Sequence, residues 1–187
     1  MKTIIFDIDG TITNMWPIEK LVLLSLLNKK RETDIENSYQ SGMRDTYKIF
    51  LAISKKKTNK VNYQKFYNQK FMLLENKRQL PKPEKYPAVD FILRNKTRYH
   101  FLFVTGGQDK ETRYVLKRLG IYEIFDLANS LNKNNYRFSK STGLPFKKIK
   151  KEFLDCLLIS DSQSDCDGAK KAGMPFIIIK PPKPYCP

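Results

Sequence analysis

The chain has 187 residues, of which 41% are hydrophobic and 12% aromatic. This length and composition suit one domain with a small insertion and exclude an intrinsically disordered protein. Lysine and arginine total 35 against 19 acidic residues, an excess that favours phosphorylated or polyanionic partners, although a general compositional bias explains it equally well. The three cysteines, Cys156, Cys166 and Cys186, form no C-x-x-C pair, which argues against a disulfide framework or zinc site and is typical of a reducing compartment.

The most apolar stretch is LVLLSLL at residues 21–27, far short of the roughly 20 residues that a transmembrane helix needs. The chain begins at once with a strand-like run, so no signal peptide is predicted. We therefore expect a cytoplasmic protein with no membrane partner. The sequence does not indicate an oligomeric state.

The first predicted element is a buried strand, TIIF at residues 3–6, which is followed by Asp7, Asp9, Gly10 and Thr11. Two carboxylates at the end of a buried strand are costly unless something uses their charge. A strand followed by an ordinary Asx-type turn is the alternative interpretation, because Asp and Gly favour turns for their own reasons.

Residues 14–83 contain no convincing buried strand and are predicted to form a helical insertion. Three helices are expected, in WPIEKLVLLSLLNKK, RDTYKIFLAIS and NYQKFYNQKFMLLENK, before the proline-rich linker LPKPEKYP. The third helix has one face available for packing, formed by Tyr63, Phe66, Tyr67, Phe71 and Leu74. We interpret these aromatic residues as core rather than as a base-stacking platform. The basic runs at 28–31 and 54–57 are interpreted as solvated helix faces, with an electrostatic funnel for phosphorylated substrates as the alternative.

After the insertion, apolar runs with strand character alternate with helical patterns. The further strands are FLFVT (101–105), LLIS (157–160) and FIIIK (176–180), and the helices lie in KETRYVLKRLG, PFKKIKKEFL and DCDGAKKAGM. Continuous apolar runs are typical of parallel strands that are buried on both faces. The predicted fold is therefore α/β, a doubly wound, mostly parallel Rossmann-like sheet with an inserted α-helical subdomain. Residues 1–13 and 84–187 would form the sheet domain, and residues 14–83 the insertion.

Three of the predicted strands end in polar residues suited to catalysis, namely Asp7, Thr105 and Asp161. Ligands of open α/β sheets bind beyond the carboxyl ends of the strands, so these residues are expected to meet in one crevice. Asp9 and Asp165 lie just past two of these ends. Clustered carboxylates are tolerable when they hold a cation such as Mg²⁺. A Thr hydroxyl and the amides of a Gly-Gly turn can hold phosphate oxygens. The pattern predicts magnesium-assisted phosphoryl transfer to an aspartate.

In this arrangement of motifs the sequence resembles the haloacid dehalogenase (HAD) superfamily, specifically its helical-cap phosphatases of the phosphoglycolate phosphatase type. The family's Asp-x-Asp-Gly-Thr motif stands at residues 7–11, and its hydrophobic strand ending in Thr is FLFVTGG. Its acidic motif is LLISDSQSD followed by GAKKAGM. The resemblance covers about 115 residues of the sheet domain, and the insertion is unmatched in detail.

The resemblance implies a role for each matched residue. Asp7 would be the nucleophile that becomes an aspartyl-phosphate, and Asp9 the general acid and base. Mg²⁺ would be held by Asp7, by the backbone carbonyl of Asp9 and by Asp161. Thr105 and the amide of Gly106 would bind the transferring phosphoryl group. Asp165 would support the metal shell or a lysine, and the insertion would be a cap that closes over the site and selects the substrate.

The phosphate-binding lysine is the least clearly matched motif. The family often shows Lys-Pro, whereas here Lys140 is followed by Ser in RFSKSTGLPF. Lys140 is preferred because it precedes the predicted helix that starts near Pro145, with Lys147 and Lys148 as rivals inside that helix. Ser160 precedes Asp161 where many family members have Gly, a difference expected to crowd the loop slightly without removing a ligand.

The function indicated is a Mg²⁺-dependent phosphatase that hydrolyses a small phosphomonoester, such as phosphoglycolate, a sugar phosphate or a nucleotide. A phosphomutase is one alternative, because it uses the same two aspartates. A phosphatase of nucleic-acid ends or nucleotides that uses the basic surface is another. A binding protein that has lost catalysis is disfavoured because Asp7 and Asp9 are both present.

Overall fold

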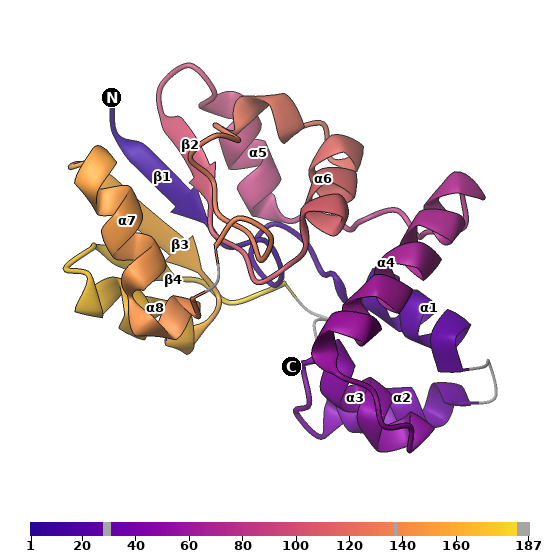
Figure 1. Cartoon of the computed structure of the whole chain (residues 1–187). Coiled ribbons are helices and arrows are strands. Elements are labelled where there is room, and N and C mark those ends of the chain that lie inside the picture. Colours follow the sequence, from indigo (N-terminus) through magenta and orange to yellow (C-terminus); the bar gives the residue numbers. More distant parts are fainter. Residues whose placement is uncertain (28–30, 137, 183–187) are drawn as a thin grey trace. The chain divides into compact units, whose positions relative to one another are not determined.

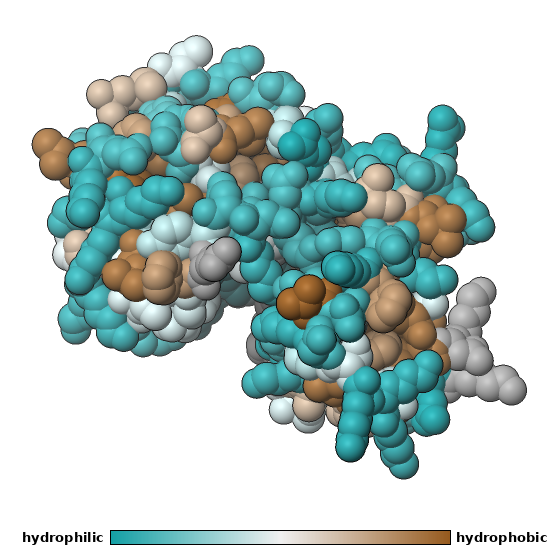
Figure 2. Space-filling model, in the orientation of Figure 1, coloured by the Kyte–Doolittle hydropathy of each residue, from teal (hydrophilic) through white to brown (hydrophobic). Residues whose placement is uncertain are grey.

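The computed structural model describes residues 1–27, 31–136 and 138–182. The predictions for Cys186 and for residues 28–30 of the first basic run fall outside this part of the chain. The described residues form two compact units: a sheet unit of residues 1–14 and 83–182, and a helical unit, Met15–Lys82. Over the same ranges, no helix combines the length and apolar character needed to span a membrane, and hydrophilic residues cover most of the face shown in Figure 2.

The sheet unit is built on four parallel strands in the order β2-β1-β3-β4. Their bounds are β1 Thr3–Phe6, β2 His100–Phe103, β3 Cys156–Ser160 and β4 Phe176–Ile178. Ile5 of β1 lies between Leu102 of β2 and Leu158 of β3. The predicted parallel sheet is therefore confirmed, with each predicted strand present.

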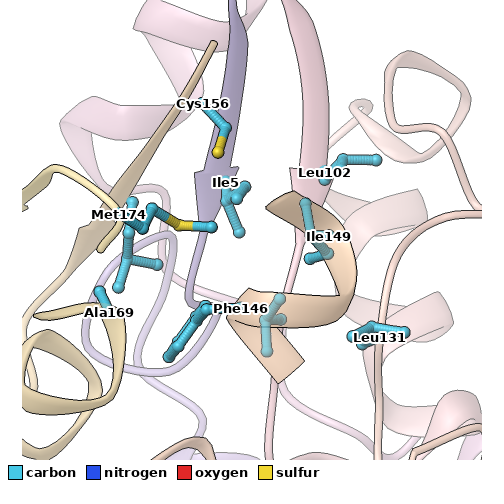
Figure 3. Packing of buried hydrophobic residues seen from close by; sticks show 10 residues of the cluster. Ile5, Leu102, Leu131, Phe146, Ile149, Cys156, Ala169 and Met174 are labelled. Atoms are coloured by element: carbon cyan, nitrogen blue, oxygen red, sulfur yellow. The ribbon is translucent and has the colours of Figure 1, made fainter. Parts of the chain in front are cut away.

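Helices cover both faces of this sheet, as a doubly wound fold requires. The helices α5 (Pro87–Arg94) and α6 (Asp109–Arg118) lie on one side, and α7 (Leu144–Glu152) and α8 (Gln163–Lys171) on the other (Figure 1). Because side chains alternate along a strand, Ile5, Leu102 and Leu158 share the face that packs on α7 and α8. They form a buried cluster there with Phe146, Ile149 and Ala169 (Figure 3).

β4 departs from the prediction that all four strands are buried on both faces. Phe176, Ile177 and Ile178 are 39%, 47% and 49% exposed, whereas all four residues of β1 are buried. β4 is an edge strand that pairs only with β3 in the described sheet. The other edge strand, β2, stays buried because bridges at Phe101–Phe125 and Val104–Leu131 border it. An apolar run predicts a strand but does not tell an edge strand from a central one.

The helical unit has four helices in its described residues: α1 Trp16–Leu27, α2 Glu32–Gln40, α3 Thr46–Ser54 and α4 Lys60–Asn76. α1, α3 and α4 confirm the three predicted helices. α2 was missed because its sequence, ETDIENSYQ, buries only Ile35 and Tyr39 and so carries little helical periodicity. α5 of the sheet unit was also missed, because its first residue, Pro87, is the last residue of the predicted proline-rich linker. Proline is tolerated in the first turn of a helix.

The aromatic face of α4 forms core, as predicted, with one exception. Tyr63, Tyr67, Phe71 and Leu74 are buried, at the i, i+4, i+8, i+11 spacing of a single helix face. Phe66 is 53% exposed, so its assignment to this face is wrong. Its position one residue before Tyr67 turns it about 100° away from the buried face.

Candidate active site

Strand register brings the predicted site residues to one edge of the sheet. The Val104 amide donates to the Phe6 carbonyl at 2.9 Å, and the Asp7 amide donates to the Ile159 carbonyl at 3.0 Å. Asp7 therefore lies between the loops that follow β2 and β3, where Thr105 and Asp161 stand. This edge carries the carboxyl ends of the strands, the position at which open α/β sheets bind ligands.

A half-buried lysine bridges two buried aspartates. The Lys140 ammonium lies 2.9 Å from Asp7 Oδ1 and also contacts Asp165 Oδ2. The side chains of Asp7 and Asp165 are 9% and 4% exposed, and that of Lys140 is 18% exposed. Charge-assisted hydrogen bonds at such depth hold three side chains in one geometry before any ligand arrives.

Local structure explains why Lys140 reaches Asp7 and its rivals do not. Lys140 begins the short 3₁₀ turn η3 (Lys140–Thr142), which leads through Gly143 into α7. Lys147 and Lys148 lie within α7 and are exposed. Of these three lysines, Lys140 is therefore the one that contacts Asp7.

Asp161 is held by the turn that follows β1. Thr11 Oγ1 donates to Asp161 Oδ1 at 3.2 Å and accepts from the Asp161 amide at 3.1 Å. Gly10 has φ +75°, and a Cβ there would lie 2.8 Å or less from the Asp161 carboxylate oxygens. Glycine is required at this position for both its backbone conformation and the close approach of Asp161.

Thr105, Gly106 and Asp9 lie on loops at the same edge. The Thr105 hydroxyl accepts from the Gly107 amide at 3.1 Å, which folds the loop back toward α6. Gly106 is exposed and faces open space, since a Cβ added there would meet no atom within 4 Å. Asp9 is half-buried in the turn after β1. Within the described chain no hydrogen bond joins Thr105 to the Lys140 network.

The charges in this cluster do not balance. Burial opposes the charge of Lys140, but the Asp7 and Asp165 carboxylates outweigh it and raise the pKa of Lys140 to about 12. Burial and the Asp7 charge raise the pKa of Asp165 to about 6, against the opposing effect of Lys140. The same two causes, burial first, raise the pKa of Asp161. One ammonium thus faces three mutually repelling carboxylates.

The sequence matches a known protein family. A family model of the haloacid dehalogenase-like hydrolases matches residues 4–179. The chain belongs to this family. The predicted HAD resemblance is therefore confirmed. No curated protein matches the chain in sequence.

Several solved structures share the HAD fold with this chain. A predicted phosphoglycolate phosphatase from Haemophilus somnus has 21% identity and a TM-score of 0.70, covering 95% of this chain and 84% of its own. CbbY from Rhodobacter sphaeroides, in complex with xylulose-(1,5)-bisphosphate, has 16% identity and a TM-score of 0.71, with coverages of 96% and 86%. YfnB from Bacillus subtilis, bound to magnesium, has 18% identity and a TM-score of 0.63, with coverages of 95% and 88%.

The donor atoms at this HAD site suit a hard cation. Asp7 and Asp161 offer carboxylate oxygens, the ligands that Mg²⁺ prefers, and their mutual repulsion is what a bound cation relieves. Among the described residues, no group of three or more His, Cys, Asp or Glu side chains is placed to hold a metal.

The structure adds a residue whose role the sequence did not reveal. Ser160 was expected to crowd the loop, but its buried hydroxyl donates to Asp165 Oδ2 at 3.0 Å and accepts from the Ser162 amide at 3.1 Å. The sequence signal for this role was a serine at the end of a predicted buried strand, five positions before Asp165. It was not decisive because the partner is known only once β3 and α8 are placed.

Proposed function

We propose that this HAD-family protein is a Mg²⁺-dependent phosphatase that hydrolyses a small phosphomonoester through an aspartyl-phosphate on Asp7. The observation that carries the proposal is the contact of Lys140 with the buried Asp7 at 2.9 Å, beside Asp161. A carboxylate attacks a phosphate dianion only if the repulsion between them is offset, and this site has a fixed cation for that purpose.

The chain's own residues would divide the two steps of the reaction. The Asp7 carboxylate attacks phosphorus, the bond from phosphorus to the ester oxygen breaks, and Asp9 donates its proton to that leaving oxygen. Asp9 then takes a proton from water, whose oxygen attacks phosphorus. Cleavage of the aspartyl-phosphate bond releases inorganic phosphate and restores Asp7. Both aspartates lie in the loop after β1, which fits this shared role.

The remaining residues would bind and orient the phosphoryl group. Lys140, the Thr105 hydroxyl and the amide of Gly106 would hold its non-reacting oxygens. Mg²⁺ would be held by Asp7, Asp161 and the Asp9 carbonyl, and it would supply further neutralisation of the phosphate charge. Thr11 keeps Asp161 in place for this purpose.

We propose that the helical unit, Met15–Lys82, is the cap that selects the substrate. Support comes from its insertion directly after the loop that carries Asp7 and Asp9. A separate compact unit at that place in the chain is suited to closing over a site and excluding water. The magnesium-bound structure of YfnB is described as revealing interdomain movement, which fits such a role.

Two related activities use the same residues. A phosphomutase would return the phosphoryl group to another hydroxyl of the same substrate without releasing phosphate. A phosphatase of nucleic-acid ends or nucleotides is favoured by one observation, the exposed lysines at residues 55–57 of the helical unit. The small-molecule phosphatase remains the leading proposal, and the predicted phosphoglycolate phosphatase of similar fold supports it.

The test is release of inorganic phosphate from an aryl phosphate, with Mg²⁺ and with a chelator. We expect Mg²⁺-dependent turnover that Asp7→Asn abolishes. Asp155→Asn is the matched control, because the Asp155 side chain is 73% exposed and precedes β3. Full turnover by Asp7→Asn would refute the mechanism. Isomerisation of a sugar phosphate without phosphate release would favour the phosphomutase.

A further inference from the structure

One face of α8 contacts the short turn that carries Lys140. Asp165, Gly168 and Lys171 are spaced three residues apart and therefore lie on one side of the helix. Asp165 contacts the Lys140 ammonium, and the Lys171 ammonium donates to the Ser141 carbonyl at 2.9 Å. α8 thus contacts both the side chain of Lys140 and the backbone of η3.

A further close approach is at Gly168, a buried residue in the middle of α8. A Cβ at Gly168 would overlap the Lys140 carbonyl oxygen and would lie 3.0 Å from both the Lys140 carbonyl carbon and Phe146. Glycine is a poor helix former, so its place here is explained by the backbone of η3, which lies where a side chain would otherwise be.

Gly143, which ends η3, is fitted to the same helix. It has φ +79°, and a Cβ there would lie 2.8 Å from the Gly168 carbonyl oxygen and 3.0 Å from Lys171 Cβ. Two glycines, one on each side of the contact, therefore allow the backbones of η3 and α8 to approach. The backbone of Lys140 is located by packing on α8.

The position of the Lys140 ammonium is set by its contact with Asp165. Ser160 is fully buried, and its hydroxyl donates to Asp165 Oδ2, the same oxygen that accepts from Lys140. The Ser162 amide in turn donates to the Ser160 hydroxyl. Ser160 therefore holds the carboxylate that aims Lys140 at Asp7.

We propose that the α8 face formed by Asp165, Gly168 and Lys171 is a seat that sets the position of Lys140, with Gly168 and Ser160 as positioning residues. Gly168 sets where the Lys140 backbone lies, and Ser160, acting through Asp165, sets where its ammonium points. For the role of Lys140 in turnover, this inference rests on the proposed function. The effect of Gly168 and Ser160 on the position of Lys140 does not depend on that function.

The seat makes Gly168→Ala and Ser160→Ala informative. Restoring an ordinary contact at Gly168 requires a backbone displacement of more than about 1 Å, and misplacement of about 1 Å already costs about 100-fold in rate. Ser160→Ala leaves Lys140 bound to Asp165 but frees the carboxylate, and we expect a loss of about tenfold. Lys170→Ala is the control, since Lys170 lies on the exposed side of α8; its turnover should stay within twofold.

The decisive experiment measures aryl phosphate turnover and the inhibition constant of inorganic phosphate for these variants, alone and combined with Lys140→Ala. If both residues act through Lys140, their effects disappear once Lys140 is removed, whereas a general loss of folding would persist. Effects that remain undiminished in the Lys140→Ala background would overturn the proposal. Ser160→Ala, which removes one hydroxyl, carries the test if Gly168→Ala does not fold.

A crystal structure of each variant separates this inference from the proposed function. We expect the Lys140 ammonium of Gly168→Ala to lie more than 4 Å from Asp7 Oδ1, instead of 2.9 Å. If the wild type releases no phosphate, the proposed function fails, and the position of Lys140 in these structures still tests the seat. A Lys140 unmoved in both variants would overturn it.

Discussion

Lys140→Met removes the ammonium that contacts the buried Asp7 and Asp165 carboxylates and should destabilise the protein strongly. A pKa raised from 10.5 to about 12 corresponds to about 2 kcal/mol in favour of the charged lysine. Because the folded-state pKa is raised, this stabilisation is fully present below about pH 10.5 and is lost as the pH rises through about 12. Removing one partner of a buried pair also leaves the other charge uncompensated, so the total cost is expected at about 3–5 kcal/mol near neutral pH.

The cost should depend on pH with a definite sign. Burial and the charge of Asp7 raise the pKa of Asp165 from 3.8 to about 6, so a proton on Asp165 stabilises the folded state, and that benefit is lost as the pH rises through about 6. Without Lys140, protonation at pH 5 relieves the repulsion between Asp165 and Asp7. The destabilisation by Lys140→Met should therefore be larger at pH 8 than at pH 5.

Urea unfolding at pH 5 and pH 8 measures the cost of Lys140→Met and its dependence on pH. A chelator is present so that no metal ion replaces the lost charge. Lys147→Met is the matched control, because Lys147 is exposed on α7, and its free energy of unfolding should change by less than about 0.5 kcal/mol. The electrostatic reasoning is refuted if Lys140→Met costs less than about 1 kcal/mol at pH 8, or if its cost is the same at both pH values.

Two further changes test other parts of the sheet unit. Thr11→Val keeps the shape of the side chain but removes both hydrogen bonds to Asp161, so Mg²⁺ affinity measured by calorimetry should fall about tenfold; unchanged affinity would mean that Asp161 needs no such support. Leu158→Ala, in the fully buried centre of β3, should lower the unfolding free energy by about 2–5 kcal/mol, whereas Ile177→Ala, 47% exposed in β4, should cost about 1 kcal/mol or less. Equal costs in urea unfolding would contradict the burial assigned to the two strands.

Local signals account for the parts of the fold that could be predicted. A continuous apolar run identified each strand, and the spacing of Tyr63, Tyr67 and Phe71 identified the buried face of α4. α2 was missed because a short helix with few buried residues is stabilised by tertiary packing rather than by its own pattern. α5 was missed because its first residue, Pro87, ends the proline-rich stretch. The exposure of β4 was missed for a related reason, since a strand's place in the sheet depends on its neighbours.

In the candidate site, too, some features follow from local sequence patterns and others only from tertiary packing. By itself the sequence determined the parallel α/β fold, the family, and the strand ends at which Asp7, Thr105 and Asp161 stand, because these follow from periodicity and motifs within a few residues. Only the tertiary structure decided that Lys140 reaches Asp7, that Thr11 holds Asp161 from 150 residues away, and that Ser160 and Gly168 lie against the lysine network. Such contacts depend on how β3, η3 and α8 pack. A local pattern carries no information about which distant backbone will fill the space left by a missing side chain.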